Sequence, residues 1–134
     1  MVGWILASLV LLFVQSLLPA AIRYAANARS LSANFTDALG PRDVPLPTVP
    51  RAERASRALA NLLESLPIFL TLALLVIILG ADGALARLGA AVYVVGRVVY
   101  VPCYVHGVFA VRSLVWMGAG VGLLLLLAAV LPFA

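Results

Sequence analysis

The sequence predicts an all-α integral membrane protein whose protomer is a four-helix bundle. Hydrophobic residues make up 65% of the 134 residues, only 10% are charged, and the mean hydropathy is +1.16. Soluble domains are nearer half apolar and a quarter charged, so a water-soluble globule and a disordered chain are both excluded. The apolar residues fall into four stretches, each close to the roughly 20 residues that a helix needs to cross a bilayer. In lipid each segment must satisfy its own backbone hydrogen bonds, so the stretches are predicted to be helices of one domain covering residues 1–134.

The first span is predicted at about residues 2–26, and it carries no charge between Val2 and Ile22. Its end resembles a signal-peptide cleavage site at Ala26-Asn27-Ala28. No basic segment precedes it, however, and its apolar run exceeds the roughly 7–15 residues of a signal peptide. We therefore expect this stretch to be retained as a membrane span.

A long polar loop is predicted at about residues 27–50. Prolines in its second half favour an extended, polyproline-like backbone rather than a helix. They are Pro41, Pro45, Pro47 and Pro50.

The remaining spans are predicted at about residues 51–81, 84–111 and 112–133. In the apolar part of the second span the only charged residue is Glu64, whereas the third contains Arg97 and His106. The apolar part of the last span is uncharged. There Gly118 and Gly122 form a small-xxx-small pair, which favours close packing of helices.

All nine basic residues are arginines, and most lie on one side of the predicted spans. Seven flank the long loop or the connection between the third and fourth spans, against Arg87 alone on the opposite side. The seven are Arg23, Arg29, Arg42, Arg51, Arg54, Arg57 and Arg112. Since cytoplasmic segments carry the excess of basic residues, the long loop is expected in the cytoplasm and both termini outside.

Polar side chains form a stripe on each of the two middle spans. On the second span, Arg57, Asn61 and Glu64 are spaced i, i+4 and i+7, within about 60° of one another on a helical wheel. Arg54 extends this stripe toward the cytoplasm. Ionisable residues within spans cost roughly 2.5–3.5 kcal/mol each on insertion, so they are candidates for function. The stripe on the third span consists of Tyr93, Arg97, Tyr100 and Tyr104.

Glu64 and Arg97 are expected at similar depth in the membrane, because each lies two to three helical turns from the cytoplasmic end of its span. One interpretation is a purely structural ion pair between them. The other is a ligand site, in which further donors form a mouth suited to a zwitterionic ligand with several carboxylates. Glu64 would then meet the ammonium group of the ligand. The further donors are Arg54, Arg57, Asn61 and Arg112.

The second span carries a motif that resembles the signature of the MAPEG family, the membrane-associated proteins in eicosanoid and glutathione metabolism. The pattern R-x-x-R-A-x-x-N-x-x-E-x-x-P-x-F is matched at every defined position between Arg54 and Phe69. Span number, order and length agree as well, so the resemblance covers essentially the whole chain. Matches to the small bacterial members in particular are Gly40-Pro41-Arg42-Asp43, Arg97-x-x-Tyr100-x-x-x-Tyr104 and Arg112-Ser113-Leu114-x-Trp116.

The resemblance implies a homotrimer in a bacterial inner membrane, with glutathione bound as co-substrate between protomers on the cytoplasmic side. Arg112 would stabilise the glutathione thiolate, and Arg23 or Arg29 of an adjacent protomer would join the site. The residues predicted to bind glutathione, from the stripes and the motif together, are Arg54, Arg57, Asn61, Glu64, Arg97, Tyr100 and Tyr104.

Three departures distinguish the chain from eicosanoid-forming members. Ser65 stands where some of them have tyrosine, and His106 stands where leukotriene-synthesising members have arginine. Arg112 follows Tyr104 by eight residues instead of seven. Because some family members bind lipid without catalysis, the resemblance supports the ligand site more strongly than the chemistry.

Two functions are therefore predicted as alternatives. In the first, Arg112 and Tyr104 are catalytic, and the thiolate attacks a lipophilic electrophile or lipid peroxide that arrives from the bilayer. In the second, the protein is a non-catalytic trimeric module that binds a lipid or a partner protein, and Arg112 only anchors a helix start on the cytoplasmic side. Membrane lipids are expected partners in both, and nucleic acid in neither.

Cys103 is expected to be a packing residue, and His106 is not expected to bind a metal. A single cysteine forms no intramolecular disulfide, and Cys103 lies in an apolar segment typical of packing. His106 has no second ligand at metal-binding spacing, so no metal site is predicted.

Overall fold

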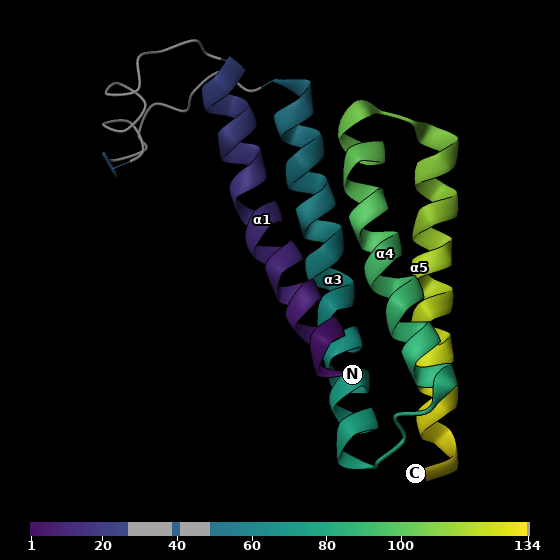
Figure 1. Ribbon diagram of the computed structural model, residues 1–134. Coiled ribbons are helices and arrows are strands. Elements are labelled where there is room, and N and C mark those ends of the chain that lie inside the picture. Colours follow the sequence, from purple (N-terminus) through teal and green to yellow (C-terminus); the bar gives the residue numbers. More distant parts are fainter. Residues whose placement is uncertain (27–38, 41–48, 134) are drawn as a thin grey trace.

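The computed structural model describes residues 1–26, 39–40 and 49–133, and its long elements are all helices (Figure 1). They are α1 (Val2–Ala26), α3 (Pro50–Ile78), α4 (Ala84–His106) and α5 (Phe109–Val130), followed by the short 3-10 helix η1 (Leu131–Phe133). Four segments of the described chain are long and apolar enough to cross a membrane, so the predicted all-α fold with four candidate spans is confirmed. Arg29, Arg42 and the prolines at 41, 45 and 47 lie outside the described residues.

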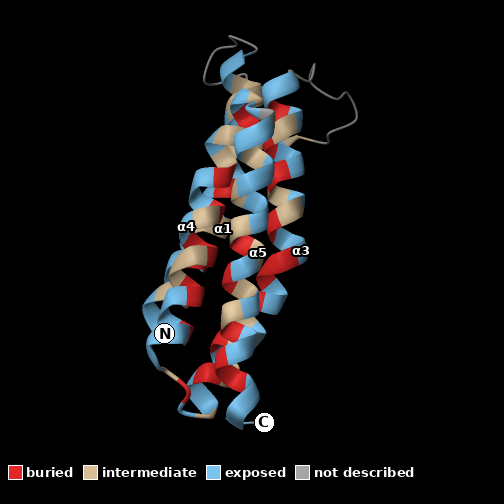
Figure 2. Ribbon diagram, turned by 90° about the vertical axis from the view of Figure 1, so that its right-hand side faces the viewer, coloured by how far each residue is buried: buried red, intermediate tan, exposed pale blue. Residues whose placement is uncertain are grey.

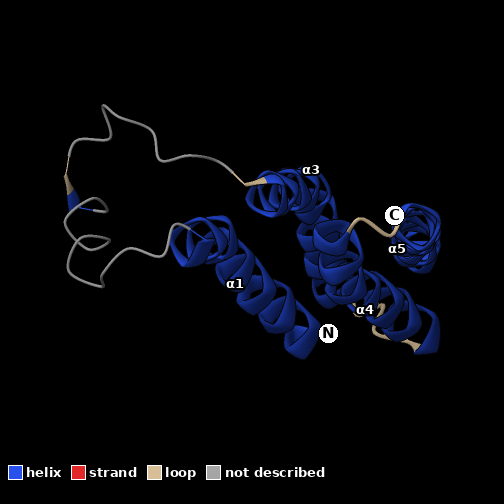
Figure 3. Cartoon of the chain, turned by 90° about the horizontal axis from the view of Figure 1, so that it is seen from above, coloured by secondary structure: helices blue, strands red, loops and turns tan. Residues whose placement is uncertain are grey.

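The helices are arranged in a row, with α3 and α4 between α1 and α5 (Figure 3). The contact between α4 and α5 is the most extensive in the described bundle, and α1 packs mainly against α3. Only Ser8 and Gln15 of α1 are buried, and Ser8 donates its hydroxyl proton to the carbonyl of Ile5 at 2.7 Å. Trp4, Ile5, Leu11 and Leu12 pack partly buried against the core, and most of the other large apolar side chains of α1 are exposed, as expected for a helix in lipid.

Several helix boundaries differ from the predictions. Pro50, expected in an extended segment, is the first residue of α3, where a proline is favoured because the first N–H of a helix has no partner within it. The predicted third span, 84–111, ends earlier, because Gly107 adopts a left-handed φ of 79° after His106. The amide of Val108 then bonds to the carbonyl of Cys103 at 2.9 Å, and α5 begins at Phe109 instead of residue 112. A glycine C-cap therefore sets the turn between α4 and α5.

The crossing of α4 and α5 is built on glycine. A Cβ on Gly122 would lie 2.6 Å from the amide nitrogen of Tyr93, and a Cβ on Gly96 would lie 3.1 Å from the Cβ of Ala119. The predicted small-residue packing is thus present at Gly122 but not at Gly118, where a Cβ would meet nothing within 4 Å. Gly118, four residues before Gly122, therefore makes no close helix contact within the described protomer, contrary to its predicted part in the pair.

The core lies along the faces that α3, α4 and α5 turn toward one another (Figure 2). Phe69 of α3 stacks on Tyr93 of α4, with ring centroids 4.4 Å apart and an interplanar angle of 11°. Both side chains are fully buried. This aromatic stack fixes the rotation of α3 relative to α4, and hence which side of α3 faces the site.

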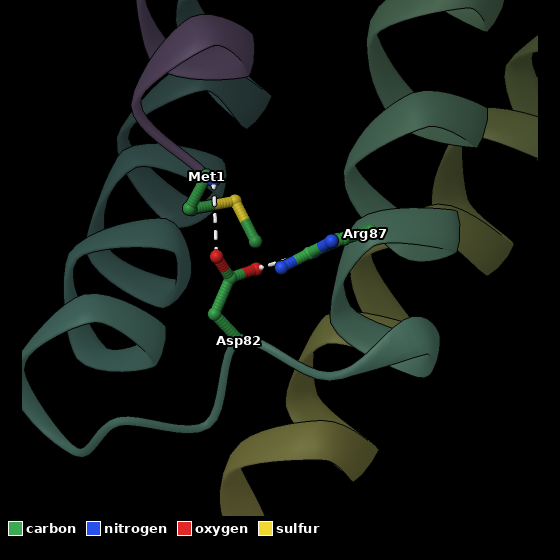
Figure 4. Close-up of polar contacts among 3 residues, drawn as sticks. All are labelled: Met1, Asp82 and Arg87. Atoms are coloured by element: carbon green, nitrogen blue, oxygen red, sulfur yellow. Dashed lines mark hydrogen bonds and ion pairs between the residues drawn. The ribbon is translucent and has the colours of Figure 1, made fainter.

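The two ends of the bundle differ in charge. In Figure 1 the connection between α4 and α5 lies at the same end as the C-terminus of α1 and the start of α3, whereas both termini and the α3–α4 loop lie at the opposite end. At that opposite end the carboxylate of Asp82 accepts a hydrogen bond from Arg87 Nε at 3.2 Å and lies 3.4 Å from the N-terminal ammonium of Met1 (Figure 4). The hydrogen bond from Arg87 lowers the pKa of Asp82 from its usual value, against an opposing effect of desolvation.

Candidate functional site

A pocket of about 350 Å³ opens at the basic end, where α3, α4 and α5 meet. It is lined by Arg54 and Arg57 of α3, Tyr104 of α4, Gly107 in the turn, and Arg112 of α5. The structure thus brings three arginines of the predicted mouth together, although Arg112 is more than fifty residues from Arg54 and Arg57 in the chain. Guanidinium groups converging on one small volume create a site of positive potential that favours an anionic ligand.

The stripe predicted on the third span forms a continuous ladder of rings and cations. The Cζ of Arg97 lies 5.4 Å from the ring centroid of Tyr93 and 5.7 Å from that of Tyr100. The rings of Tyr100 and Tyr104 follow, with centroids 5.3 Å apart, and the Cζ of Arg112 lies 4.8 Å from the ring centroid of Tyr104. Each guanidinium is within the range of a cation–π interaction. The ladder connects the pocket to the interior of the bundle.

Arg54 stabilises the turn between α4 and α5, next to the pocket. Its Nη1 donates a hydrogen bond of 3.4 Å to the carbonyl of Val105 in the last turn of α4. A Cβ on Gly107 would lie 2.8 Å from the same nitrogen, so a larger residue would displace the tip of Arg54, and the φ of 79° there disfavours side chains in any case. The carbonyls at the end of a helix carry partial negative charge, and a cation placed there is stabilising. Arg54 therefore holds the end of α4 against α3 as well as lining the pocket.

Asn61 is the centre of a hydrogen-bond hub that joins three helices. Its Oδ1 accepts one bond from Nη1 of Arg97 at 2.9 Å and a second from Nε1 of Trp116 at 3.0 Å. Arg97 is only 4% exposed, and within the described part of the chain its Nε has no hydrogen-bond partner. The hub thus places a buried guanidinium directly inward of the pocket.

The predicted pairing of Glu64 with Arg97 is wrong within the protomer. Arg97 bonds to Asn61 instead, and Glu64 is exposed on the outward side of α3. The reason is rotation: at about 100° per residue, Asn61 is turned roughly 60° closer than Glu64 to the buried face of α3. The predicted stripe on α3 is about 60° wide, and its two edges therefore differ: Asn61 lies at the border of the core, and Glu64 lies on the outer surface.

Ser65 points into the core and takes no part in the pocket. Its Oγ lies 2.9 Å from the hydroxyl of Tyr93 and 3.3 Å from the carbonyl of Asn61. The departure from members with tyrosine at this position therefore serves packing: a small hydroxyl satisfies the buried phenol of Tyr93. The hydroxyl of Tyr93 is thus hydrogen-bonded inside the bundle, and in this it differs from Tyr104, which lines the pocket.

Two residues of the site were not predicted from the sequence. Trp116 lies four residues after Arg112 and therefore on the same side of α5, but a tryptophan near a membrane interface is ordinary. Gly107 follows a basic last turn, which is a typical signal for a helix end, but it lies inside a long apolar run. In both cases the role depends on a neighbouring helix, which the sequence alone does not place.

No curated protein and no solved structure matches the chain. The family model described as "MAPEG family" matches residues 1–132, almost the full length. The motif on α3, the four candidate spans and this match agree. The chain belongs to the MAPEG family, the membrane-associated proteins in eicosanoid and glutathione metabolism.

Proposed function

We propose that the protein binds glutathione at the pocket of Arg54, Arg57, Tyr104 and Arg112, and uses it as a transferase or peroxidase on lipophilic substrates. The convergence of three helices on this one pocket carries the proposal. Its volume, about 350 Å³, lies in the usual range for small-molecule sites. Glutathione has two carboxylates, and guanidinium groups offer paired donors that match carboxylate geometry.

Arg57 is the residue best placed to bind a carboxylate. It is exposed at the pocket, and it forms no hydrogen bond or ion pair with any residue that the structure describes. Arg54, by contrast, already donates to Val105 and supports the pocket wall. Asn61 and Arg97 lie inward of Arg57 and provide further donors. We assign Arg57 the main contact with a glutathione carboxylate.

Glu64 supports an assembly of several protomers. A carboxylate exposed on the outer surface of a span costs roughly 2.5–3.5 kcal/mol in lipid, so it is expected to be covered by protein. A homotrimer, as common in the family, would cover the outward face of α3 with a neighbouring chain. Glu64 would then lie at the protomer boundary, where it accepts the ammonium group of glutathione.

The chemical step needs a thiolate, and Arg112 is the cation assigned to it. A thiol of this kind is mostly protonated near neutral pH, and a neighbouring cation shifts it toward the thiolate. The thiolate attacks an electrophilic carbon to form a C–S bond, and the leaving group departs with its electron pair. With a lipid peroxide, the thiolate attacks one oxygen, the released alkoxide takes a proton, and a second glutathione converts the sulfenic acid to a disulfide and water. Tyr104, under the guanidinium of Arg112, positions that cation.

The lipophilic substrate has a candidate path along α3. An apolar groove of about 340 Å³ is lined by Pro67, Ile68, Thr71 and Leu72. These residues follow Glu64 along the same outward face of the helix, deeper in the predicted span. A substrate dissolved in the bilayer would reach the thiolate from this side. The same topology, with its basic end in the cytoplasm and both termini outside, suits a multi-pass protein of a bacterial inner membrane.

Calorimetric titration of the purified protein with glutathione tests the site. Arg57→Ala is expected to weaken binding about tenfold to a hundredfold, because a hydrogen-bonded contact to a charged group is lost. Arg51→Ala is the matched control: Arg51 is exposed on the same helix but does not line the pocket, so its loss should leave the dissociation constant unchanged. Failure of the wild type to bind, or equal binding by Arg57→Ala, would refute the assignment.

A non-catalytic module that binds a lipid or a partner protein is the second candidate. It is favoured by Ser65, whose hydroxyl contacts that of Tyr93 in the core where some eicosanoid-forming members have tyrosine, and by Arg112, which follows Tyr104 by eight residues instead of seven. Turnover of a chlorodinitrobenzene electrophile and of cumene hydroperoxide with glutathione separates the candidates. Glutathione binding without turnover of either compound would support the second.

A further inference from the structure

Trp116 makes a contact that its position on the surface of α5 does not suggest. Its side chain is 50% exposed, yet Nε1 donates a hydrogen bond to Oδ1 of Asn61 at 3.0 Å. An indole has a single N–H and accepts no hydrogen bond. The bond to Asn61 therefore uses all of the hydrogen-bonding capacity of Trp116.

The oxygen of the Asn61 carboxamide accepts hydrogen bonds, whereas its nitrogen donates them. Its Oδ1 offers two lone pairs, and its Nδ2 carries two hydrogens. Arg97 and Trp116 each direct an N–H at Oδ1, at 2.9 Å and 3.0 Å, so both lone pairs are used. Rotating the carboxamide by half a turn would set its NH2 group against these two donors. The two bonds together therefore exclude the rotated orientation.

We propose that Trp116 is a positioning residue which, with Arg97, holds the Asn61 carboxamide so that only its NH2 group is presented to the ligand. The inference rests on the proposed binding of glutathione. Asn61 then selects a hydrogen-bond acceptor, which in glutathione is a carboxylate or a peptide carbonyl oxygen. An ammonium or a peptide N–H of the ligand placed at Asn61 meets only donors and is rejected.

Trp116, which orients Asn61, and Arg112, the cation at the pocket, lie on the same helix. Arg112 and Trp116 are four residues apart, so they lie on one side of the helix, one turn from each other. Arg112 stacks on Tyr104 while Trp116 bonds to α3. A single rigid helix thus places both the cation assigned to the thiolate and the donor that orients Asn61.

The contact itself is tested without a ligand. The chain has two tryptophans, so in a Trp4→Phe background Trp116 gives the only indole N–H resonance. In detergent micelles, Asn61→Ala should shift this resonance upfield and speed its exchange with water, since the acceptor has been removed. An indole resonance that Asn61→Ala leaves unchanged would overturn the contact.

The positioning role is tested by binding. Trp116→Phe keeps an aromatic ring and removes the N–H, and it should raise the dissociation constant of glutathione about threefold to tenfold. In an Asn61→Ala background the same substitution should have no further effect, because the group that it orients is absent. An equal effect in both backgrounds would show a packing role and overturn the proposal. Trp4→Phe, at the far end of the bundle, is the matched control and should bind as the wild type does.

The presented NH2 group is tested by Asn61→Asp. This substitution keeps an oxygen for Arg97 and Trp116 and replaces the NH2 group by a second acceptor, so it should weaken glutathione binding more than Asn61→Ala. Binding by Asn61→Asp at least as tight as that of Asn61→Ala would contradict the selection of an acceptor. If the wild-type protein does not bind glutathione, the proposed function is refuted, and with it the role of Trp116 in binding glutathione. Whether Trp116 holds Asn61 is decided separately by the indole resonance.

Discussion

Gly89 and Gly122 touch backbone to backbone where α4 crosses α5. A Cβ on Gly122 would lie 2.7 Å from the carbonyl oxygen of Gly89, and a Cβ on Gly89 would lie 2.8 Å from the carbonyl oxygen of Gly122. The contact is reciprocal, so neither residue can be enlarged unless the helices move apart. Helices in a membrane gain stability from close packing of this kind, because lipid provides no hydrophobic drive for their association.

Gly122→Ala should therefore destabilise the protein by about 1–3 kcal/mol, as an overpacked helix contact does. Thermal unfolding in detergent, followed by circular dichroism, measures the change. Gly118→Ala is the matched control on the same helix, since its Cβ would meet nothing within 4 Å, and it should leave the midpoint unchanged. Equal losses in the two variants would contradict the packing described here.

Arg54→Ala should loosen the turn between α4 and α5. It removes the hydrogen bond to the carbonyl of Val105 and the cation at the end of α4, which together contribute about 1 kcal/mol. The expected result is faster hydrogen exchange at the amide of Val108, which closes the turn on Cys103. Arg51→Ala removes an exposed arginine one turn away and should not change that exchange rate. Protection that survives Arg54→Ala would show that Gly107 alone maintains the turn.

Arg112→Ala should lower the fraction of bound glutathione that is ionised at neutral pH. The substitution removes the cation that α5 contributes to the pocket, and without it the thiolate is less stable relative to the thiol. The ionised fraction is measured by the absorbance of the thiolate near the ultraviolet edge. Tyr104→Phe keeps the ring on which Arg112 stacks and removes only the hydroxyl, so it should preserve most of the thiolate. An unchanged thiolate fraction in Arg112→Ala would remove the catalytic assignment of this arginine.

Acid should weaken the end of the bundle that carries Asp82. Because the hydrogen bond from Arg87 lowers the pKa of Asp82 in the folded protein, its stabilising effect is complete above the usual aspartate pKa and is lost as the pH falls through the lowered value. The midpoint of thermal unfolding should therefore fall over that acidic range. Asp82→Asn should remove this part of the pH dependence, and adding Arg87→Gln to it should have little further effect. A pH profile that Asp82→Asn leaves unaltered would exclude the contribution.

The sequence was sufficient for the features that depend on one helix at a time. Apolar length predicted the spans, and spacing along the third span predicted the ladder from Tyr93 to Tyr104. It was insufficient wherever the rotation of one helix against another decides the outcome. Asn61 and Glu64 are less than a turn apart, yet the Phe69–Tyr93 stack turns the first toward Arg97 and leaves the second outside. Gly118 and Gly122 share a spacing motif, and only the packing of α5 on α4 shows which of them makes the contact.

The buried guanidinium of Arg97 links ligand occupancy to the stability of the whole bundle. Its charge has no carboxylate partner among the residues that the structure describes, and the nearest compensation comes from one carboxamide oxygen and two aromatic rings. A cation in this position raises the free energy of the empty protein, and an anion bound in the adjacent pocket lowers it. By mass action, any anion that binds only the folded state raises the unfolding midpoint in proportion to the logarithm of its concentration. Because Arg97 is a buried cation that a membrane helix tolerates poorly, the stability of the folded protein depends on how fully the pocket is occupied by an anion.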